Sequence, residues 1–258
     1  MWLMQKFFQL NHLHYAYFES TPSILDLRSI REGQLAYENL MLANLPIQSG
    51  RILDVGCGTC ELSRRLKELD FEVHGLAPED FMEQLFSDKV GAKFFKLRFE
   101  ELSESENYDL LIFSESLQYI PLDSFIEKSR SILSPGGKII ISDYFLTDDD
   151  FQGSRRSGHL LSSFHQKIQT DFDVLENLDI TANILPTLDF IENIVHQQVE
   201  PVIEYLKSRS LSKGFMQRIL MNWIYRLYER KYQPQLQCLN RGEVIKTRRY
   251  LFYILELK

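Results

Sequence analysis

The residues with the clearest potential for chemistry lie at positions 52–62, which read Ile-Leu-Asp-Val-Gly-Cys-Gly-Thr-Cys-Glu-Leu. Gly56 and Gly58 let backbone N–H groups approach a ligand closely, and a helix that starts after them offers further unpaired N–H groups. A dinucleotide-binding turn would have a third glycine where Glu61 stands. Asp54 adds a second carboxylate beside the turn. These residues predict a site for a cationic ligand and disfavour a pyrophosphate.

Cys57 and Cys60 form a C-x-x-C pair inside the same turn, a spacing found in redox and zinc sites. The chain has one other cysteine, Cys238, and no second C-x-x-C or histidine pair that would complete a tetrahedral metal site. We interpret both cysteines as small turn residues and expect no metal site.

Composition and charge limit the class of protein. The chain has 258 residues, 44% of them hydrophobic and 25% charged, which is typical of one globular α/β domain or of a core with a cap. The net charge of −7 gives no general attraction for nucleic acid. No segment has the length of a membrane span, and the apolar N-terminal run is too short for a signal peptide. A cytoplasmic location is therefore expected.

Strand-like and helical segments alternate along the first 145 residues. Strand-like runs are expected at residues 51–55, 71–76, 93–97, 108–113 and 138–145, and helical segments at 24–45, 62–69 and 78–87. The runs Leu110–Phe113 and Ile139–Ile141 are apolar on both faces, as buried parallel strands require. The pattern predicts an α/β fold with a mostly parallel sheet that helices cover on both faces.

The last part of the chain has a different organisation. Residues 183–235 have a helical pattern, and residues 249–257 again resemble a strand. A strand after so long a helical stretch suggests that the chain returns to the sheet. The expected parts are an N-terminal helical lid at 1–45, a core at 46–182 and 248–258, and an inserted helical cap at 183–247.

Four segments together resemble class I S-adenosylmethionine (SAM)-dependent methyltransferases. Residues 52–62 are similar to motif I of that family, L-D-x-G-C-G-x-G, with Cys60 at the place of its third glycine. Residues 12–18 resemble the H-Y-G-Y-W segment of the ubiquinone, tocopherol and cyclopropane-fatty-acid group. Residues 108–114 are similar to the F-D-L-V-x-S fourth strand, and residues 133–138 to the L-x-P-G-G-x turn before the fifth strand.

The resemblance implies a Rossmann-like, seven-stranded, mostly parallel sheet, with SAM as the cofactor. Asp54 would orient the amino acid end of SAM, and Ser114 and Glu115 would face its methionine portion or the substrate. The full set of implied cofactor contacts is Tyr15, Asp54, Gly56, Cys57, Gly58, Leu76, Ala77, Phe99, Glu100, Ser114 and Glu115.

Two departures from the family pattern concern the nucleoside. Ala77 stands where the family has an acid for the ribose hydroxyls, and Arg98 stands where it has a short acid at the adenine. A charge-assisted contact to the ribose is worth roughly 1.5–3 kcal/mol, or about a tenfold or greater change in affinity. Because Glu79 or Asp80 could reach the ribose instead, weakened rather than abolished SAM binding is expected.

The candidates for catalysis are Tyr119, Asp143 and His159. Tyr119 takes the place where many relatives have a histidine, and it could line the substrate pocket. Asp143 could accept a substrate proton or simply end the fifth strand. His159 and His165 follow a charged loop, and each could be a general base or a solvated surface residue.

Residues 207–249 contain eleven Lys or Arg against two acids, with aromatic and aliphatic residues recurring every three or four positions. This stripe could pack on the core, line a pocket for an apolar acceptor, or rest on an anionic membrane surface. A peripheral membrane contact through residues 207–249 is kept as a hypothesis.

The combined expectation is a methyltransferase that acts on a small, apolar or lipid-like acceptor without a metal ion or nucleic acid. Its main tasks would be in-line positioning and the exclusion of water. One alternative is a SAM-fold protein that has lost methyl transfer and serves as a partner or a cyclase. A second is a nicotinamide-dependent oxidoreductase, which Glu61 disfavours. A third, a nucleic-acid methyltransferase, lacks an N-P-P-Y-like motif.

Overall fold

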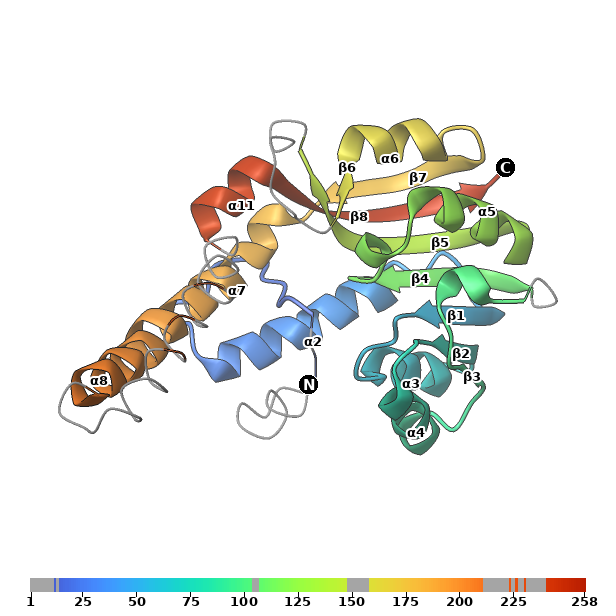
Figure 1. The fold of residues 1–258 in the computed structure, drawn as a ribbon. Helices are drawn as coiled ribbons and strands as arrows, with labels where there is room; N and C mark the ends of the chain where they lie inside the picture. The colour runs from blue at the N-terminus through green and yellow to red at the C-terminus, as the bar shows by residue number, and fades with distance from the viewer. Residues whose placement is uncertain are drawn as a thin grey trace.

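The computed structural model describes residues 12, 14–103, 107–147, 158–210, 223, 226, 230 and 240–258. These residues contain a mixed sheet in the order β3-β2-β1-β4-β5-β8-β7, with the short β6 paired to β5 (Figure 1). The strands are β1 (Arg51–Val55), β2 (Glu72–Leu76), β3 (Phe94–Phe95), β4 (Tyr108–Ser114), β5 (Leu133–Leu146), β6 (His159–Leu160), β7 (Phe172–Asp179) and β8 (Arg248–Leu257). Pairings among β1–β6 are parallel, and β8 is antiparallel to both β5 and β7. The predicted fold class, a mostly parallel sheet to which the chain returns at its end, is confirmed.

Helices cover both faces of this sheet (Figure 1). The helical elements are α2 (Leu27–Ala43), α3 (Glu61–Glu68), α4 (Asp80–Lys89), η1 (Phe99–Glu101), η2 (Leu117–Tyr119), α5 (Leu122–Ile132), α6 (Leu161–Ile168), α7 (Thr181–Ile194), η4 (Val195–Val199), α8 (Glu200–Ser210) and α11 (Arg241–Thr247). Buried side chains of α2, α3, α4, α7 and α11 share one core cluster with the sheet. Those of α5 and α6 share a second cluster on the opposite face.

The central strands are buried on both sides because their side chains alternate between the two clusters. On β4, Leu110 and Ile112 belong to the first cluster, whereas Leu111 and Phe113 belong to the second. The isoleucines Ile139–Ile141 of β5 are fully buried and alternate in the same way. This explains the continuous apolar runs in the sequence, since neither face of these strands meets water.

Helix α2 begins later than the hydrophobic pattern predicts because an acid caps it. Asp26 accepts a hydrogen bond from the backbone N–H of Ser29 at 2.8 Å, and the Asp26 N–H donates to the Ser29 hydroxyl at 2.9 Å. This reciprocal capping box satisfies two backbone donors that a helix leaves unpaired. It starts the helix at Leu27, and the buried face of α2 then carries Tyr37 toward the ends of the strands.

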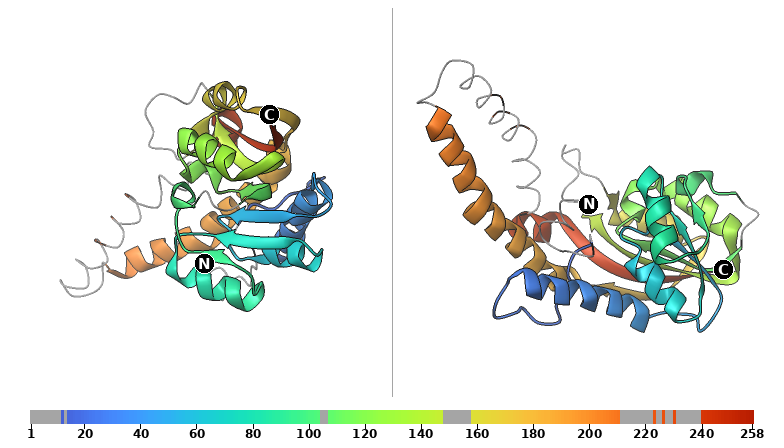
Figure 2. Two further views of the ribbon diagram at one scale, coloured as in Figure 1. Left: turned by 90° about the vertical axis from the view of Figure 1, so that its right-hand side faces the viewer. Right: turned by 90° about the horizontal axis from the view of Figure 1, so that it is seen from below.

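Beyond β7, α7, η4 and α8 follow one another as a helical arm that extends away from the sheet (Figure 2). None of the helices in the described residues is both long enough and apolar enough to cross a bilayer. Most of the basic segment 207–249, including residues 211–222 and 231–239, lies outside the described residues. The hypothesis of a membrane contact through that segment therefore stays a prediction.

Candidate functional site

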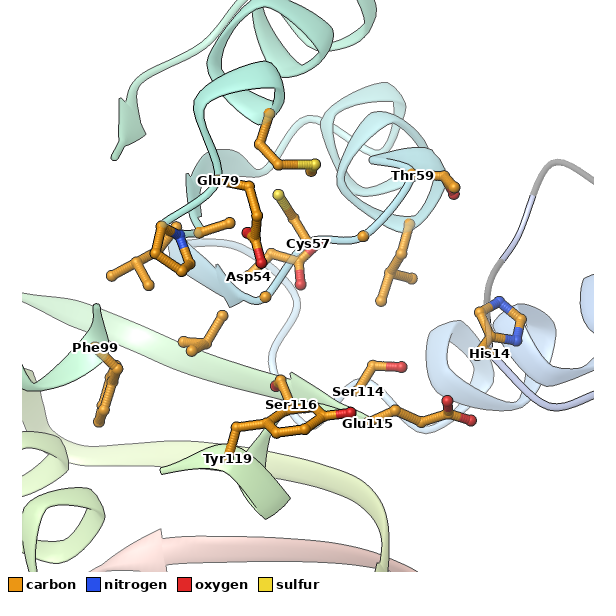
Figure 3. A pocket seen from close by; sticks show the side chains of 18 of the residues that line it. His14, Asp54, Cys57, Thr59, Glu79, Phe99, Ser114, Glu115, Ser116 and Tyr119 are labelled. Atoms are coloured by element: carbon orange, nitrogen blue, oxygen red, sulfur yellow. The ribbon is translucent and has the colours of Figure 1, made fainter. Parts of the chain in front are cut away.

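A cavity of about 540 Å³ opens at the carboxyl ends of β1, β2 and β4 (Figure 3). Ligands of open α/β sheets bind at this edge, where the strand order reverses. Every cofactor contact implied by the sequence lines the cavity except Tyr15, namely Asp54, Gly56, Cys57, Gly58, Leu76, Ala77, Phe99, Glu100, Ser114 and Glu115. The fold therefore gathers segments from four parts of the chain around one space.

The glycine turn after β1 has the backbone that close approach of a ligand requires. Gly56 and Gly58 have φ angles of 75° and 53°, in the left-handed region that favours glycine. A Cβ on Gly56 would lie 2.7 Å from the Cβ of Ser116. At Gly58 an added Cβ would meet no atom closer than 3.9 Å, so the backbone there borders open space. The turn forms a cradle on the cavity side.

Cys57 and Cys60 are free, buried thiols whose Sγ atoms lie 3.9 Å apart. The Cys60 thiol also contacts the carbonyl of Gly58, and Cys60 begins α3 from a left-handed backbone conformation with φ 65°. Both cysteines therefore hold the turn by local contacts, and Cys57 lines the cavity. Cys238 lies outside the described residues.

Two carboxylates of the turn have different environments. Asp54 is 2% exposed, and burial raises its pKa to about 6, although the Ser63 hydroxyl donates to it at 2.5 Å. Burial alone would also raise the pKa of Glu61, but Lys89 and Arg64 donate to its carboxylate and hold the pKa below its usual value. Because these two cations compensate Glu61, it repels an anion less than the sequence alone suggests.

Glu115 is the acid at the end of β4, and its backbone is strained. Its φ is 56°, which costs a non-glycine residue of the order of 1–3 kcal/mol and is found mainly at functional sites. Its Oε1 accepts the hydroxyl of Tyr250 at 2.6 Å and the backbone N–H of Tyr15 at 2.8 Å. Burial raises the pKa of this carboxyl to about 7.

Tyr37 connects this acid to the neighbouring strand end. Its hydroxyl lies 3.2 Å from that of Tyr250 and 3.0 Å from that of Ser114, so a hydrogen-bonded chain runs from Glu115 through two tyrosines to Ser114. Burial raises the pKa of Tyr37, which keeps its proton available to the chain. Four residues from α2, β4 and β8 thus act as one polar network around the cavity.

The three predicted catalytic residues lie in different places. Tyr119 lines the cavity and is 68% exposed at its edge, beside Ser116 and Glu115 (Figure 3). Asp143 is 1% exposed and does not line the cavity, since its two oxygens accept the backbone N–H groups of Gln118 and Tyr144 at 3.0 and 2.8 Å.

His159 is also outside the cavity lining. Its Nε2 lies 3.0 Å from the carbonyl of Leu117, and His165 lies 2.7 Å from the hydroxyl of Tyr253. The structure therefore brings Tyr119 to the cavity and gives both histidines partners elsewhere.

The nucleoside end is where the sequence departs most from the family pattern. Ala77, the residue after β2, has an apolar side chain, but Glu79 projects toward Asp54 and Cys57 inside the cavity (Figure 3). Asp80 pairs with Lys96 at 2.8 Å and does not line the cavity. Of the two acids considered from the sequence, Glu79 alone borders the space where a ribose would lie.

Sequence reasoning named Glu79 and the segment of His14 but did not assign four further lining or network residues, namely Tyr37, Glu38, Ser116 and Tyr250. The buried Ser116 hydroxyl borders the cavity without a hydrogen-bond partner, which marks it as a contact for a polar ligand atom. A signal for Glu79 was present in its position just after β2. No local pattern could have indicated Tyr250, which lies 135 residues from Glu115.

Comparisons with known proteins agree with this geometry. Residues 53–139 match a family model described as a methyltransferase domain. No curated protein sequence matches the chain. Its fold is similar to that of geranyl diphosphate C-methyltransferase from Streptomyces coelicolor A3(2), with a TM-score of 0.69 and 10% identity over 95% of this chain and 87% of that chain.

Two further structures have similar folds. The cyclopropane synthase MmaA2 from Mycobacterium tuberculosis has a TM-score of 0.66 and 16% identity, over 95% of this chain and 89% of that chain. The 4+2 cyclase SpnF has a TM-score of 0.64 and 15% identity, over 95% of this chain and 86% of that chain. At such identities the likeness concerns the fold.

Proposed function

We propose that this chain binds SAM in the cavity and methylates a small, uncharged and largely apolar acceptor, because residues 53–139 match a methyltransferase-domain model and the fold is similar to that of a SAM-family methyltransferase. The observation that carries the proposal is the strained, half-buried Glu115, fixed by Tyr250 and Tyr15 at the edge of a cavity with a glycine cradle.

The residues of the cavity fit SAM. The open backbone at Gly58 and the unpartnered hydroxyl of Ser116 offer contacts to a ligand that enters beside the turn. Asp54 and Glu115 provide carboxylates, and the sole lysine or arginine among the described lining residues is Arg98. A cavity with this excess of acids suits a cation. The similar geranyl diphosphate enzyme was crystallised in complex with S-adenosyl-L-homocysteine, which supports the same class of ligand here.

When bound, SAM supplies a methyl group on a good leaving group, so the protein's tasks are to position, to exclude water and to handle a proton. Glu115 is held in one orientation through Oε1, and it projects toward His14 at the end of the cavity (Figure 3). With a pKa of about 7, it can accept a proton from an acceptor near neutral pH. The chain through Tyr250 and Tyr37 to Ser114 stabilises the ionised carboxylate of Glu115, the form that accepts the proton.

An uncharged acceptor follows from the electrostatics. The exposed Tyr119 and the neighbouring Ile120 offer an apolar edge to the cavity. Arg98 has Glu100 3.9 Å away, so it is poorly placed to hold a diphosphate of the kind named for the similar geranyl diphosphate enzyme. We propose that the N-terminal segment 1–45 acts as a lid, because its residues His14, Tyr37 and Glu38 line the cavity. None of the described residues of 183–247 lines the cavity, so the role of that segment as a cap stays a prediction.

One observation supports a second candidate. The fold likeness to a 4+2 cyclase, together with Ala77 at the ribose position, is compatible with a protein that binds SAM without using its methyl group. Such a cyclase-like role would make the acidic cavity a device for electrostatic catalysis.

The two candidates differ in what happens to the cofactor. The test is calorimetric titration with SAM and S-adenosylhomocysteine, followed by incubation of methyl-labelled SAM with a fractionated metabolite extract. Label in an organic product, with an equal amount of S-adenosylhomocysteine, supports methyl transfer. Conversion of an acceptor that needs SAM but releases no S-adenosylhomocysteine supports the cyclase-like role. Absence of SAM binding would exclude both.

A further inference from the structure

A cluster of metal-ligating side chains lies at the end of the cavity and has no role in the proposed methyl transfer. His12 and His14 come from the N-terminal segment, and Glu38 comes from α2. One ligand atom from each of the three lies within 4.8 Å of the others. Glu38 is buried, with 3% of its side chain exposed, and His12 is 12% exposed.

His12 and Glu38 approach each other in the way that two ligands of one ion do. His12 Nδ1 lies 2.9 Å from Glu38 Oε1, yet this buried Nδ1 makes no hydrogen bond. Nitrogen and oxygen ligands lie about 2.0–2.2 Å from a zinc-type ion, so two ligands at the tetrahedral angle are about 3.4 Å apart. The observed separation is about half an ångström shorter than this, a difference that a small rotation of the His12 side chain would close.

His14 has the tautomer that a metal ligand requires. The carbonyl of Tyr15 can only accept, so the Nδ1 of His14 donates to it over 2.8 Å. The lone pair is then on Nε2, a buried atom that has no partner. Histidine ligands in metal sites commonly donate their second nitrogen to a backbone carbonyl in this manner.

Gln34 and Arg65 contact the cluster from outside, Gln34 as a donor that holds the histidine backbone and Arg65 as a cation that competes with an ion for Glu38. Glu38 Oε2 accepts from Arg65 at 3.0 Å, which leaves Oε1 for the ion. Gln34, one turn before Glu38 on α2, donates to the carbonyls of His12 and His14 at 3.2 and 2.9 Å. The Oε1 of Gln34 is, like His14 Nε2, a buried acceptor without a partner. Two such atoms in one place indicate a missing polar ligand.

From this geometry we propose that His12, His14 and Glu38 bind a divalent transition-metal ion of the zinc type, which anchors the N-terminal segment to α2 at the end of the cavity. Two imidazoles and one carboxylate suit Zn²⁺ better than Mg²⁺, which prefers oxygen ligands. No metal site was expected, because no second ligand pair completes the C-x-x-C spacing of Cys57 and Cys60. Positions 12, 14 and 38 form no recognised ligand spacing, and only the fold brings them together.

The test uses Co²⁺ as a spectroscopic substitute for the ion, added to the full-length protein after treatment with a chelator. The expected result is one equivalent bound, with visible d–d absorption bands of low coordination. Glu38→Gln and His14→Ala should each weaken Co²⁺ binding by roughly 100-fold or more. The matched control is His196→Ala, at an exposed histidine between Glu192 and Glu200, and it should change nothing.

A second variant keeps the proposal testable if a ligand substitution disturbs folding. Arg65→Met removes a cation that lies 3.0 Å from Glu38 and would repel the ion, so Co²⁺ should bind roughly tenfold more tightly. Absence of stoichiometric binding, or binding that Glu38→Gln and Arg65→Met both leave unchanged, overturns the proposal. Because these readouts use cobalt alone, they do not depend on whether the chain binds SAM.

Discussion

Tyr250 on β8 donates its hydroxyl to the carboxylate of Glu115 over 2.6 Å, although 135 residues separate the two. The pairing of β8 with β5, in which Tyr250 lies opposite Tyr144, sets this contact. It turns the acid at the end of β4 into a fixed group rather than a mobile side chain. The last strand of the fold therefore contributes directly to the proposed reaction centre.

The first prediction concerns Glu115 itself. Glu115→Gln keeps the size of the side chain and removes its ability to accept a proton, so methyl transfer should fall by about 100-fold or more. SAM affinity should change much less, because the cradle at Gly56 and Gly58 is untouched. Steady-state rates and calorimetric Kd values, measured on the same preparation, separate the two effects. A variant with full activity would remove Glu115 from the mechanism.

Tyr250→Phe is the companion substitution, since it deletes one hydrogen bond to Glu115 and leaves the carboxylate in place. The rate should fall less than in Glu115→Gln, and the pH at which activity is half-maximal should rise. That rise is expected because the hydrogen bond from Tyr250 lowers the pKa of Glu115. An unchanged pH profile would argue that Tyr250 has a purely structural role.

The second prediction concerns the glycine cradle. Gly56→Ala would place a methyl group 2.7 Å from the Cβ of Ser116 in a left-handed backbone, and SAM binding should be lost. Gly136→Ala is the matched control, because Gly136 has a similar φ of 70° but its added Cβ would meet no atom closer than 3.9 Å. The control should cost about 1–2 kcal/mol of stability and keep the Kd for SAM. Equal losses of binding in both variants would show that strain alone is responsible.

Local patterns were sufficient to predict the framework of this molecule. The runs Leu110–Phe113 and Ile139–Ile141 indicated buried parallel strands because burial on both faces removes the polar alternation from the sequence itself. The turn at residues 52–62 was equally readable, since positive φ angles favour glycine at fixed positions.

The face of the sheet to which a strand residue points was harder to predict. Asp143 lies between Ser142 and Tyr144, and the alternation of β5 places it on the same face as Ile141 and Phe145, in the cluster covered by α5 and α6. A sequence indicates that an acid follows a strand but not which face it takes in a given register.

Contacts between distant segments could not be predicted at all. The bond from Tyr250 to Glu115, the contact of Tyr15 with the same acid, and the cluster of His12, His14 and Glu38 each depend on how helices and strands pack in three dimensions. Nothing in the spacing of these residues along the chain encodes their distances.

The third prediction concerns the ribose. Glu79→Ala should weaken SAM binding by roughly ten- to hundredfold, because it removes a charge-assisted contact to the ribose hydroxyls. The control is Asp80→Asn, which changes the next residue, an acid that pairs with Lys96 outside the cavity. Analogues of S-adenosylhomocysteine that lack the 2′- or the 3′-hydroxyl identify the contact. Glu79→Ala should not change the affinity for the analogue that lacks the hydroxyl contacted by Glu79. If Asp80→Asn weakens binding as much as Glu79→Ala, the assignment of Glu79 is wrong.

The fourth prediction is a fall in stability as the pH rises above neutral. Burial raises the pKa of Glu115 to about 7 and that of Asp143 to about 8, so the folded protein holds more protons than the unfolded chain in this range. The free energy of unfolding must then decrease as the pH rises from 6.5 to 8.5, because these carboxyls ionise readily only when the chain unfolds. Burial lowers the pKa of His14 from 6.5 to about 4, which makes the free energy of unfolding rise with pH, but only below pH 6.5.

Urea unfolding curves at intervals across pH 6.5–8.5 measure this slope. Asp143→Asn should flatten it, because one of the two titrating groups is removed, whereas Asp80→Asn should leave it unchanged, because Lys96 lowers the pKa of Asp80. Saturating SAM should also reduce the slope, since a bound cation favours the ionised form of Glu115 in the folded state. A stability that is constant or rises with pH over this interval would show that Glu115 and Asp143 are already ionised in the folded protein, and the assignment of Glu115 as a base near neutral pH would fail.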